Sequence, residues 1–323
     1  MENDTWVVGL DIGGTKLLAG VLNKKGDIAA TAKLPTKAAT GFENGRKRIV
    51  EVIRSAVAAA GMTMEKISAI GVGSPGPLDL AKGTVIETPN LKWKNAPVRG
   101  VIEDAFGKPV KIDNDVNAGT LGEFTFGAGI GAQHVIGLFV GTGLGGGVII
   151  NGKLLHGFNQ NAAEFGHVII NPKGPKCGCG VKGHLEAYVA KSGIERKLRK
   201  YIQRGKDTSL ASILANGKQP LKSSVIAKAY KNNDKIVVKT INRSAEYLGY
   251  AVANFLNIFN PEIVILGGGL VEAFGDMYVT RVTKVATANV FPVALRNVQI
   301  AKAQLGDNAG ILGASVLAFE ALG

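Results

Sequence analysis

Four side chains that commonly bind metal ions lie close together in the second half of the sequence. His167, Cys177, Cys179 and His184 fall within eighteen residues, separated by nine, one and four residues. Two imidazoles and two thiolates are an acceptable tetrahedral ligand set for Zn²⁺. The alternative is two buried thiols in a tight loop beside unrelated histidines. Because two of only 4 histidines fall in this stretch, we expect a structural zinc site.

A glycine turn near the start of the chain has the residue types of a phosphate-binding loop. Asp11, Gly13, Gly14, Thr15 and Lys16 lie between two apolar segments. This strand-turn-strand order excludes the dinucleotide fingerprint and the Walker loop, which both require a helix after the turn. Glycine N–H groups can approach phosphate oxygens, the threonine and lysine add a hydroxyl and a cation, and the aspartate can hold Mg²⁺ through water. By itself an ordinary Gly-Gly hairpin would explain the pattern equally simply.

A second turn of the same kind favours the phosphate interpretation. It again lies between two apolar segments and contains Gly141, Thr142, Gly143, Gly145, Gly146 and Gly147. Two phosphate hairpins facing one cleft are hard to explain as two accidental turns. A third glycine segment, GGGL at 267–270, includes Gly268 and Gly269 and follows an apolar run, where a simple strand-to-helix turn is the alternative.

Two aspartates flank an asparagine at 113–115, where an apolar strand ends and a helix is expected to begin. Transfer of a phosphoryl group to a hydroxyl needs a carboxylate that accepts the hydroxyl proton, and Asp115 is well placed for that task. All three residues are also good N-caps, so Asp115 can equally serve only to cap the helix. The residues alone leave both interpretations open.

Seven motifs in order give the chain a close resemblance to the ROK family of sugar kinases, and within it to bacterial-type glucokinases. They are D-I-G-G-T-K, G-S-P-G-P-L-D, P-N-L-K-W, D-N-D-V-N, G-T-G-L-G-G-G, E-F-G-H and C-G-C-G-x-x-G-H-L-E. The resemblance implies an α/β fold of the actin/hexokinase (ribonuclease H-like) type, with two domains and a central cleft in which ATP and sugar meet. We expect a small domain of residues 1–116 plus 306–323 and a large domain of residues 117–305.

The resemblance also implies roles for individual residues. It places the general base on Asp115 and the phosphates and Mg²⁺ of ATP at the two Gly/Thr turns. The adenosine half is expected at Gly268 and Gly269. The sugar ligands implied in this way are Gly76, Asn90, Asn114, Asp115, Glu164, His167 and Glu186. In the family pattern cysteine is usual where this chain has His184, which is a departure within the expected zinc site.

The implied reaction is ATP-dependent phosphorylation of the 6-hydroxyl of a hexose, with D-glucose favoured because P-N-L-K-W and H-L-E resemble glucokinases. Other hexoses and polyphosphate as donor stay open. A sugar-sensing repressor is a different class, which we disfavour because only ten residues precede Asp11 and the related repressors carry a DNA-binding region there. The family also implies a homodimer or homotetramer.

Composition agrees with a globular enzyme. The 323 residues suit two α/β domains, and 46% hydrophobic content is enough for folded cores. A net charge of +13 favours anionic partners such as phosphates, but no nucleic-acid module is recognisable and aromatic residues are only 6%. We interpret the basic run at 196–206 as a solvated helix face. Two cysteines, an acidic N-terminus and no membrane-length apolar run predict a cytoplasmic protein that binds no membrane.

Hydrophobic periodicity predicts the elements that must position these residues. Strands at 6–12, 17–23 and 28–34 form an antiparallel meander, and helix follows at about 46–60. Strands at 67–73 and 109–112 each end in a candidate loop, and strands at 134–141 and 148–153 flank the second turn. We expect a helix at 237–259, a strand at 262–266, a helix from about 271, a strand at 298–303 and a final helix at 309–322.

Overall fold

The computed structural model describes residues 5–88, 90–215 and 221–323. Their contacts divide the chain into two compact units. The first unit comprises the described parts of 1–131, 147–162 and 304–323, and the second those of 132–146 and 163–303. The domain boundaries expected from the sequence, at residues 116 and 306, stay a prediction.

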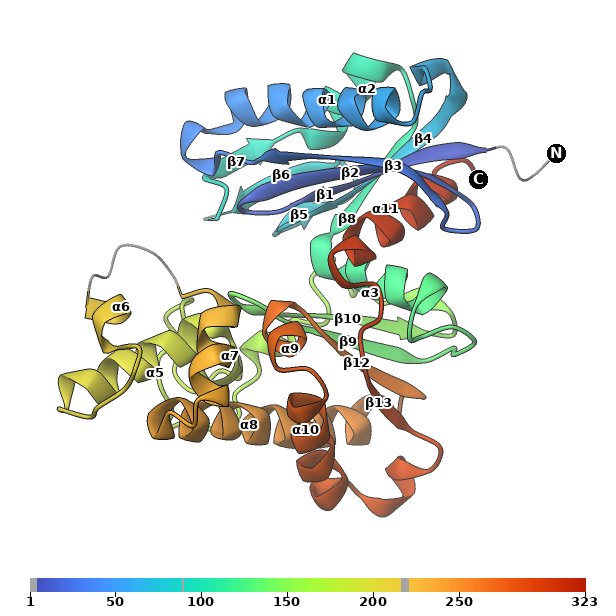
Figure 1. The fold of residues 1–323 in the computed structure, drawn as a ribbon. Coiled ribbons are helices and arrows are strands. Elements are labelled where there is room, and N and C mark those ends of the chain that lie inside the picture. The colour runs from blue at the N-terminus through green and yellow to red at the C-terminus, as the bar shows by residue number, and fades with distance from the viewer. Residues whose placement is uncertain (1–4, 89, 216–220) are drawn as a thin grey trace. The chain divides into compact units, whose positions relative to one another are not determined.

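A five-stranded mixed sheet forms the centre of the first unit, with the strand order β3-β2-β1-β4-β8 (Figure 1). Strands β1, β2 and β3 are antiparallel neighbours, which confirms the predicted meander, and β4 and β8 continue the sheet in parallel with β1. The edge strand β3 alternates between half-buried and exposed residues, as expected where one face meets solvent. The bounds are β1 Trp6–Ile12, β2 Lys16–Asn23, β3 Ile28–Pro35, β4 Ile67–Ser74 and β8 Val110–Asn114.

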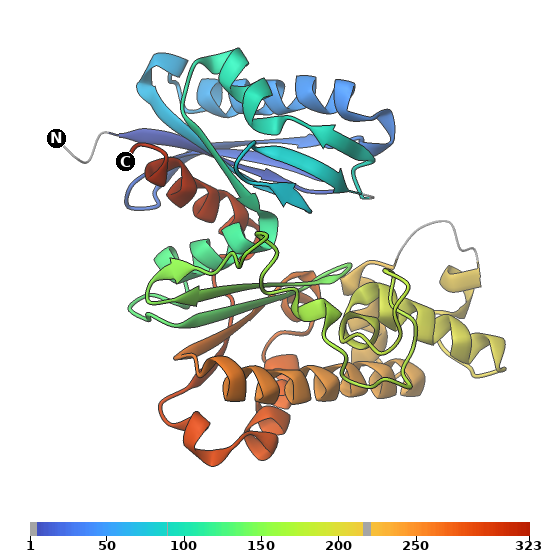
Figure 2. The ribbon, with the colours of Figure 1, turned by 180° about the vertical axis from the view of Figure 1, so that it is seen from behind.

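Helices cover both faces of this sheet. Figures 1 and 2 show α1 and α2 on one face and α11 on the other. A small antiparallel sheet, β5-β6-β7, completes the unit. The bounds are α1 Phe42–Ala59, α2 Val98–Phe106, α3 Asp115–Phe126, α11 Ala309–Glu320, β5 Leu78–Asp79, β6 Thr84–Thr88 and β7 Trp93–Ala96.

Helix α1 begins four residues before the predicted start at Arg46. The ring of Phe42, its first residue, packs edge-on against buried Trp93 with centroids 5.1 Å apart, so a tertiary contact accompanies the extra turn. Gly61 follows the helix with a φ of 66°, in the position the sequence indicated for a C-terminal glycine.

Glycines let α11 pack directly on backbone. A Cβ at Gly71 of β4 would lie 1.7 Å from the Ala314 oxygen, and a Cβ at Gly313 would lie 1.6 Å from the Ala118 oxygen of α3. Neither position has room for any side chain. The small residues of α11 therefore fix how closely it approaches both the sheet and α3.

A second five-stranded sheet has the order β11-β10-β9-β12-β13, with β12 parallel to both β9 and β13. Strands β9 and β10 flank the second Gly/Thr turn, but the prediction of a second strand at 148–153 was wrong in its bounds. Strand β10 already begins at Leu144, so Gly145, Gly146 and Gly147 belong to the strand and the turn is shorter than expected. The residues of β10 from Gly147 onward are assigned to the first unit. The bounds are β9 Val135–Val140, β10 Leu144–Ile150, β11 Lys153–Leu154, β12 Ile263–Gly267 and β13 Gln299–Lys302.

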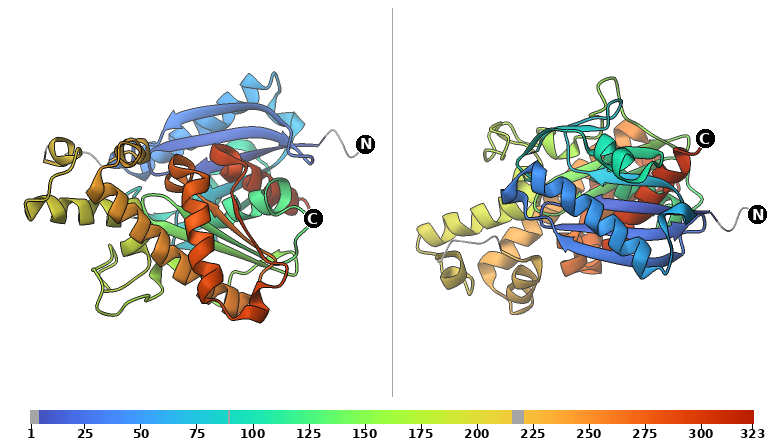
Figure 3. Two further views of the ribbon diagram at one scale, coloured as in Figure 1. Left: turned by 60° about the horizontal axis from the view of Figure 1, so that its bottom comes forward. Right: turned by 90° about the horizontal axis from the view of Figure 1, so that it is seen from above.

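The second unit carries most of the helices, and α8 and α10 pack along one another (Figure 3). Asp234 caps α8 by accepting from the N–H groups of Ile236 and Val237, and Asn260 ends it with a φ of 44°. The helix predicted from residue 271 is two helices, because Gly275 adopts a φ of 61° and separates α9 from α10. The bounds are α4 Glu186–Val189, α5 Lys191–Gln203, α6 Ala211–Ala215, α7 Ser223–Lys231, α8 Lys235–Phe259, α9 Gly269–Phe274 and α10 Asp276–Asn289.

Among the described residues, no helix combines the length and the apolar character needed to cross a membrane. The cytoplasmic location stays a prediction.

Candidate functional site

The D-N-D segment lies where β8 passes into α3, and its three residues have different structural tasks. Asn114 is the N-cap of α3, since its Oδ1 accepts from the N–H groups of Val116 at 2.9 Å and Asn117 at 3.3 Å. Asp115 is the first residue of the helix, where its negative charge is favourable. The sequence left open whether Asp115 is the N-cap of α3, and in the structure Asn114 takes that position.

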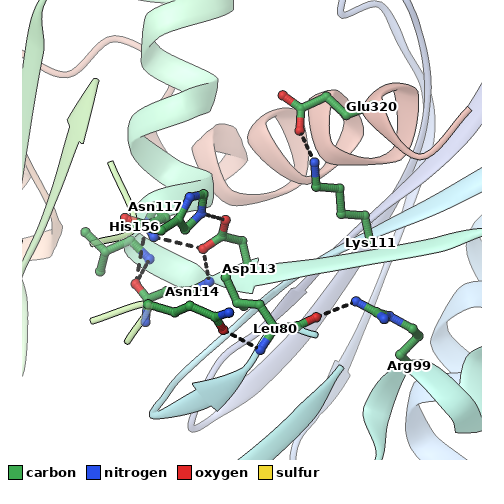
Figure 4. Close-up of polar contacts among 10 residues, drawn as sticks. Leu80, Arg99, Lys111, Asp113, Asn114, Asn117, His156 and Glu320 are labelled. Carbon is green, nitrogen blue, oxygen red and sulfur yellow. Dashed lines mark hydrogen bonds and ion pairs between the residues drawn. The ribbon is translucent and has the colours of Figure 1, made fainter. Parts of the chain in front are cut away.

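Asp113 anchors the end of β8 and is only 2% exposed. Its Oδ1 accepts from the Asn114 N–H at 2.7 Å and from Asn117 Nδ2 at 2.8 Å, while its Oδ2 lies 2.6 Å from Nε2 of His156 (Figure 4). The hydrogen bond to Asp113 outweighs partial burial and raises the pKa of His156. Sequence reasoning gave His156 no role, because it lies 43 residues from Asp113 and no spacing pattern connects the two.

The first Gly/Thr turn is a hairpin between β1 and β2, with the Gly13 N–H donating to the Lys16 oxygen at 2.9 Å. Burial, reinforced by the charge of Asp115, raises the pKa of Asp11 to about 7. The two carboxyl groups are thus close enough to interact, and carboxylate oxygens are the ligands that Mg²⁺ prefers. Lys16 Nζ lies 2.8 Å from Oδ2 of Asp307, a residue to which the sequence assigned no role.

Two further candidate sugar ligands in the first unit are Gly76, which lies near the D-N-D segment, and Asn90, which lies near the first Gly/Thr turn. A Cβ at Gly76 would lie 3.7 Å from Nδ2 of Asn114, and one at Gly14 would lie 3.7 Å from the Cβ of Asn90. Asn90 is exposed and the Gly76–Pro77 peptide bond is cis. The first unit therefore brings the D-N-D segment, the Gly76 loop and the first turn into one neighbourhood.

In the second unit, Glu186 connects the second turn to the cysteine loop. Its Oε2 accepts from the Leu144 N–H at 3.1 Å, and a Cβ at Gly143 would lie 2.6 Å from the same oxygen. Its Oε1 accepts from Cys177 Sγ at 3.1 Å. Glu186 is thus held between the turn and the loop at the start of α4.

The start of α5 supports the second turn. The Lys191 N–H donates to the Gly141 oxygen at 3.0 Å and the Ser192 N–H to the Thr142 oxygen at 3.3 Å. A cavity of about 550 Å³ adjoins the turn and is lined by Thr142 and by side chains of α5, including Arg199. The cavity gives the predicted phosphate turn an open, largely basic flank.

The four predicted metal ligands converge. Their ligand atoms all lie within 4.8 Å of one another. Nδ1 of His184 is 3.2 Å from Nδ1 of His167 and 3.2 Å from Sγ of Cys179. In a tetrahedral zinc site two imidazole nitrogens would be about 3.3 Å apart, given zinc–nitrogen bonds of about 2.0 Å. The cluster therefore has the donor atoms and the spacing that a zinc ion requires.

The GGGL segment joins β12 to α9. Gly268 has a φ of 87°, and a Cβ there would lie 2.7 Å from backbone atoms of Val140, so packing alone requires a glycine. A Cβ added at Gly269 would meet only Ser223 Oγ among the described residues, at 3.9 Å. A role in adenosine binding stays a prediction for both.

Two mixed five-stranded sheets with flanking helices and Gly/Thr hairpins define an actin-like α/β fold, which is also that of a ROK hexokinase from Thermus thermophilus. The chain belongs to the ROK family, which it matches over residues 7–321. It is 35% identical over 318 residues to the glucokinase of Thermotoga maritima, with 98% of each chain covered.

Further relatives include both a kinase structure and a repressor. The crystal structure of a ROK family glucokinase from Streptomyces griseus in complex with glucose and AMPPNP matches with a TM-score of 0.81 and 33% identity, covering 98% of this chain and 99% of that one. The xylose repressor of Caldicellulosiruptor bescii is 33% identical over 307 residues, covering 95% of this chain and 76% of the repressor. The similarity thus extends to proteins of two functional classes.

Proposed function

We propose that this protein is an ATP-dependent glucokinase that transfers the γ-phosphoryl group of ATP to the 6-hydroxyl of D-glucose. The observation that carries the proposal is the division of tasks in the D-N-D segment. Asn114 caps α3 and Asp113 anchors the strand end, so these two tasks do not fall to Asp115, whose Oδ1 accepts from the Val116 N–H at 3.0 Å. The full-length similarity to glucokinases supports the same conclusion.

In the proposed mechanism Asp115 accepts the proton of the 6-hydroxyl as its oxygen attacks the γ-phosphorus and the bond to the β-phosphate oxygen breaks. N–H groups of Gly14 and Thr142 donate to phosphate oxygens, while the Gly13 N–H closes the hairpin on the Lys16 oxygen and the Lys16 side chain offers a cation. Bound Mg²⁺ would supply further charge neutralisation on the phosphates, with Asp11 as the side chain that holds it through water.

Sugar binding in this proposal connects to the metal cluster through His167. Its Nδ1 faces His184, while its Nε2 points the other way and lies 3.9 Å from Oε2 of Glu164. A zinc ion on Nδ1 would fix the ring, so that Nε2 and Glu164 face the sugar hydroxyls together. Glu186, held by Leu144, and Asn90 and Asn114 complete the proposed set of sugar ligands.

Glucose is the proposed substrate because the similar kinases carry that specificity in their names. Another hexose, or polyphosphate as donor, would keep the same residues in the same roles. The xylose repressor supports a second candidate, a protein that binds a sugar without phosphorylating it. Both classes predict sugar binding, and only the kinase predicts turnover that depends on Asp115.

A coupled ADP-release assay tests the proposal. Purified protein is offered glucose, mannose, fructose, N-acetylglucosamine and N-acetylmannosamine with MgATP, and glucose again with polyphosphate, followed as glucose 6-phosphate. We expect the highest kcat/KM for glucose with ATP, and a loss of kcat of at least about 100-fold in Asp115→Asn. Asp104→Asn, which changes an exposed carboxylate of α2, is the matched control and should keep full activity.

Two results would contradict the proposal in different ways. Full activity of Asp115→Asn with unchanged melting behaviour would remove Asp115 as the base. No turnover of any hexose, together with glucose binding measured by calorimetry, would replace the kinase with a sugar-binding protein.

A further inference from the structure

The second unit contains another cavity, of about 530 Å³, whose lining is strongly basic. It lies between the loop that precedes Cys177, helix α5 and helix α8, and we name it the basic cavity. Helix α5 contributes Arg196, Lys197 and Lys200. No role assigned above involves this cavity, although the basic residues of α5 stood out in the sequence.

Four more cations line the basic cavity from the other two elements. Lys173 and Lys176 belong to the loop, and Lys239 and Arg243 lie one turn apart on α8. Two side chains of the same charge at positions i and i+4 destabilise a helix slightly. Helix α5 has such a pair in Arg196 and Lys200, and α8 has one in Lys239 and Arg243. The arrangement costs stability, so an external anion is a better explanation for it than solvation alone.

The seven cations have no carboxylate partner among the described residues. No aspartate or glutamate lines the basic cavity, and none of these side chains forms an ion pair with the described part of the chain. The neighbouring Arg199 shows the contrast, since it pairs with Glu195 at 2.7 Å and does not line the basic cavity. Within the part of the chain that the structure describes, the positive charge of the basic cavity is therefore not neutralised by ion pairs.

Aromatic rings hold two of the cations in place. Lys197 Nζ lies 4.9 Å from the ring centre of Tyr201, and the Arg243 guanidinium lies 5.5 Å from that of Tyr247. Tyr247 also accepts from Arg243 Nη2 at 3.3 Å and stacks on Tyr188 with centroids 3.9 Å apart. Cations fixed by rings lose less conformational freedom when an anion binds.

The floor of the basic cavity is neutral. Thr240 donates to the Ile236 oxygen at 2.7 Å, and the Ser244 hydroxyl lies 2.8 Å from that of Tyr278, so both are satisfied inside the protein. Ile194 and Ala187 are buried beside them. Specific binding would thus come from the charged rim rather than from the neutral floor.

We propose that the basic cavity is a binding site for a small anion that carries at least two phosphate groups. A volume of about 530 Å³ lies within the range of sites for small molecules, and seven cations that form no ion pair with the described residues suit several negative charges. The shared chemistry is a pair of phosphates, either free as pyrophosphate or attached to a nucleoside or a sugar. The site is separate from the proposed phosphate turn, although Arg196 and Lys200 also line the cavity beside Thr142.

Because two cations are shared, the test uses residues that line only the basic cavity. The double variant Lys239→Gln/Arg243→Gln removes two charges from α8, and Lys173→Gln/Lys176→Gln removes two from the loop. The matched control is Lys228→Gln/Lys231→Gln, which neutralises two exposed lysines of α7 in the same unit. Melting curves confirm that each protein is folded.

Inorganic pyrophosphate is titrated by calorimetry into full-length protein saturated with glucose and AMPPNP. We expect binding to the wild type and to the control, and affinity weakened by about tenfold or more in each of the two cavity variants. Further titrations with ADP and with a hexose bisphosphate show whether phosphates attached to a nucleoside or to a sugar bind more tightly. Loss of binding of either compound in the cavity variants supports the site.

Unchanged pyrophosphate affinity in both cavity variants, or no binding to the wild type, would overturn the proposal. Failure of AMPPNP to bind would count against the proposed kinase function only. In that case the same comparison of variants, made without the analogue, still decides whether the basic cavity binds phosphates.

Discussion

Nε2 of His156 lies 2.6 Å from Oδ2 of Asp113, and this pair joins the end of β8 to the segment that follows β11. Asp113 in turn accepts from Asn114 and Asn117, so the histidine is connected to the first turn of α3. We therefore interpret His156 as a positioning residue for the segment that carries Asp115.

Replacing His156 by alanine should reduce phosphorylation without removing the proposed base. Losing the contact loosens Asp113, and a small displacement of Asp115 lowers kcat by about tenfold. Steady-state kinetics should show the loss mainly in kcat, with KM for ATP nearly unchanged. His156→Asn, which is too short to reach Asp113, should behave the same way. Wild-type kcat in both variants would refute the positioning role.

The same pair predicts a pH dependence of stability. The ordinary pKa of histidine is 6.5, and the hydrogen bond to Asp113 raises the pKa of His156 in the folded protein. The protonated histidine thus stabilises the fold fully below about pH 6.5. This contribution is lost as the pH rises through the raised pKa.

Urea unfolding of the wild type and His156→Gln between pH 5.5 and 9 measures the effect. The difference in free energy of unfolding should be largest at the acidic end and shrink as the pH rises. A difference in free energy of unfolding that grows with pH would show that folding lowers the pKa of His156 instead of raising it.

The cysteine loop should hold one zinc ion per chain and lose it when a ligand is removed. Metal analysis is expected to give one zinc for the wild type and for His184→Cys, which has the residue usual in the family, and none for Cys179→Ala. Lys173, Lys176 and Lys182 are exposed in this loop, so trypsin should cut Cys179→Ala faster there. A full complement of zinc in Cys179→Ala would exclude the cluster as the metal site.

Close packing of α11 on α3 predicts a stability cost for the smallest possible substitution. A Cβ at position 313 would overlap the Ala118 oxygen, so Gly313→Ala should destabilise by about 3 kcal/mol or more because backbone must move. Gly100→Ala on helix α2 is the matched control, since a Cβ there would have no described atom within 4 Å apart from its own helix backbone and chain neighbours. This variant should stabilise by about 0.5–1 kcal/mol. Denaturant unfolding measures the free energy of unfolding of both variants. If Gly313→Ala is as stable as Gly100→Ala, α11 can shift freely.

Much of the fold could be predicted because it depends on neighbours along the chain. The meander of β1, β2 and β3 follows from apolar runs separated by glycine turns, and α8 ends at Asn260 as its stop signal indicated. The break at Gly275 was missed because an apolar pattern continues across it, and the early start of α1 accompanies a contact with distant Trp93.

The sequence by itself determined which residue types stand in which order: the D-N-D segment, the two Gly/Thr turns and the four metal ligands. The identities and the spacing of these residues are fixed by the covalent chain. Helix capping and turn formation depend on only a few neighbouring residues, so they can also be predicted from the sequence. Only the tertiary structure decided that Asn114 caps α3, that His156 holds Asp113, that Lys16 pairs with Asp307 and that seven cations meet at one cavity. Those contacts join segments far apart in the chain, and packing of whole helices and strands brings them together.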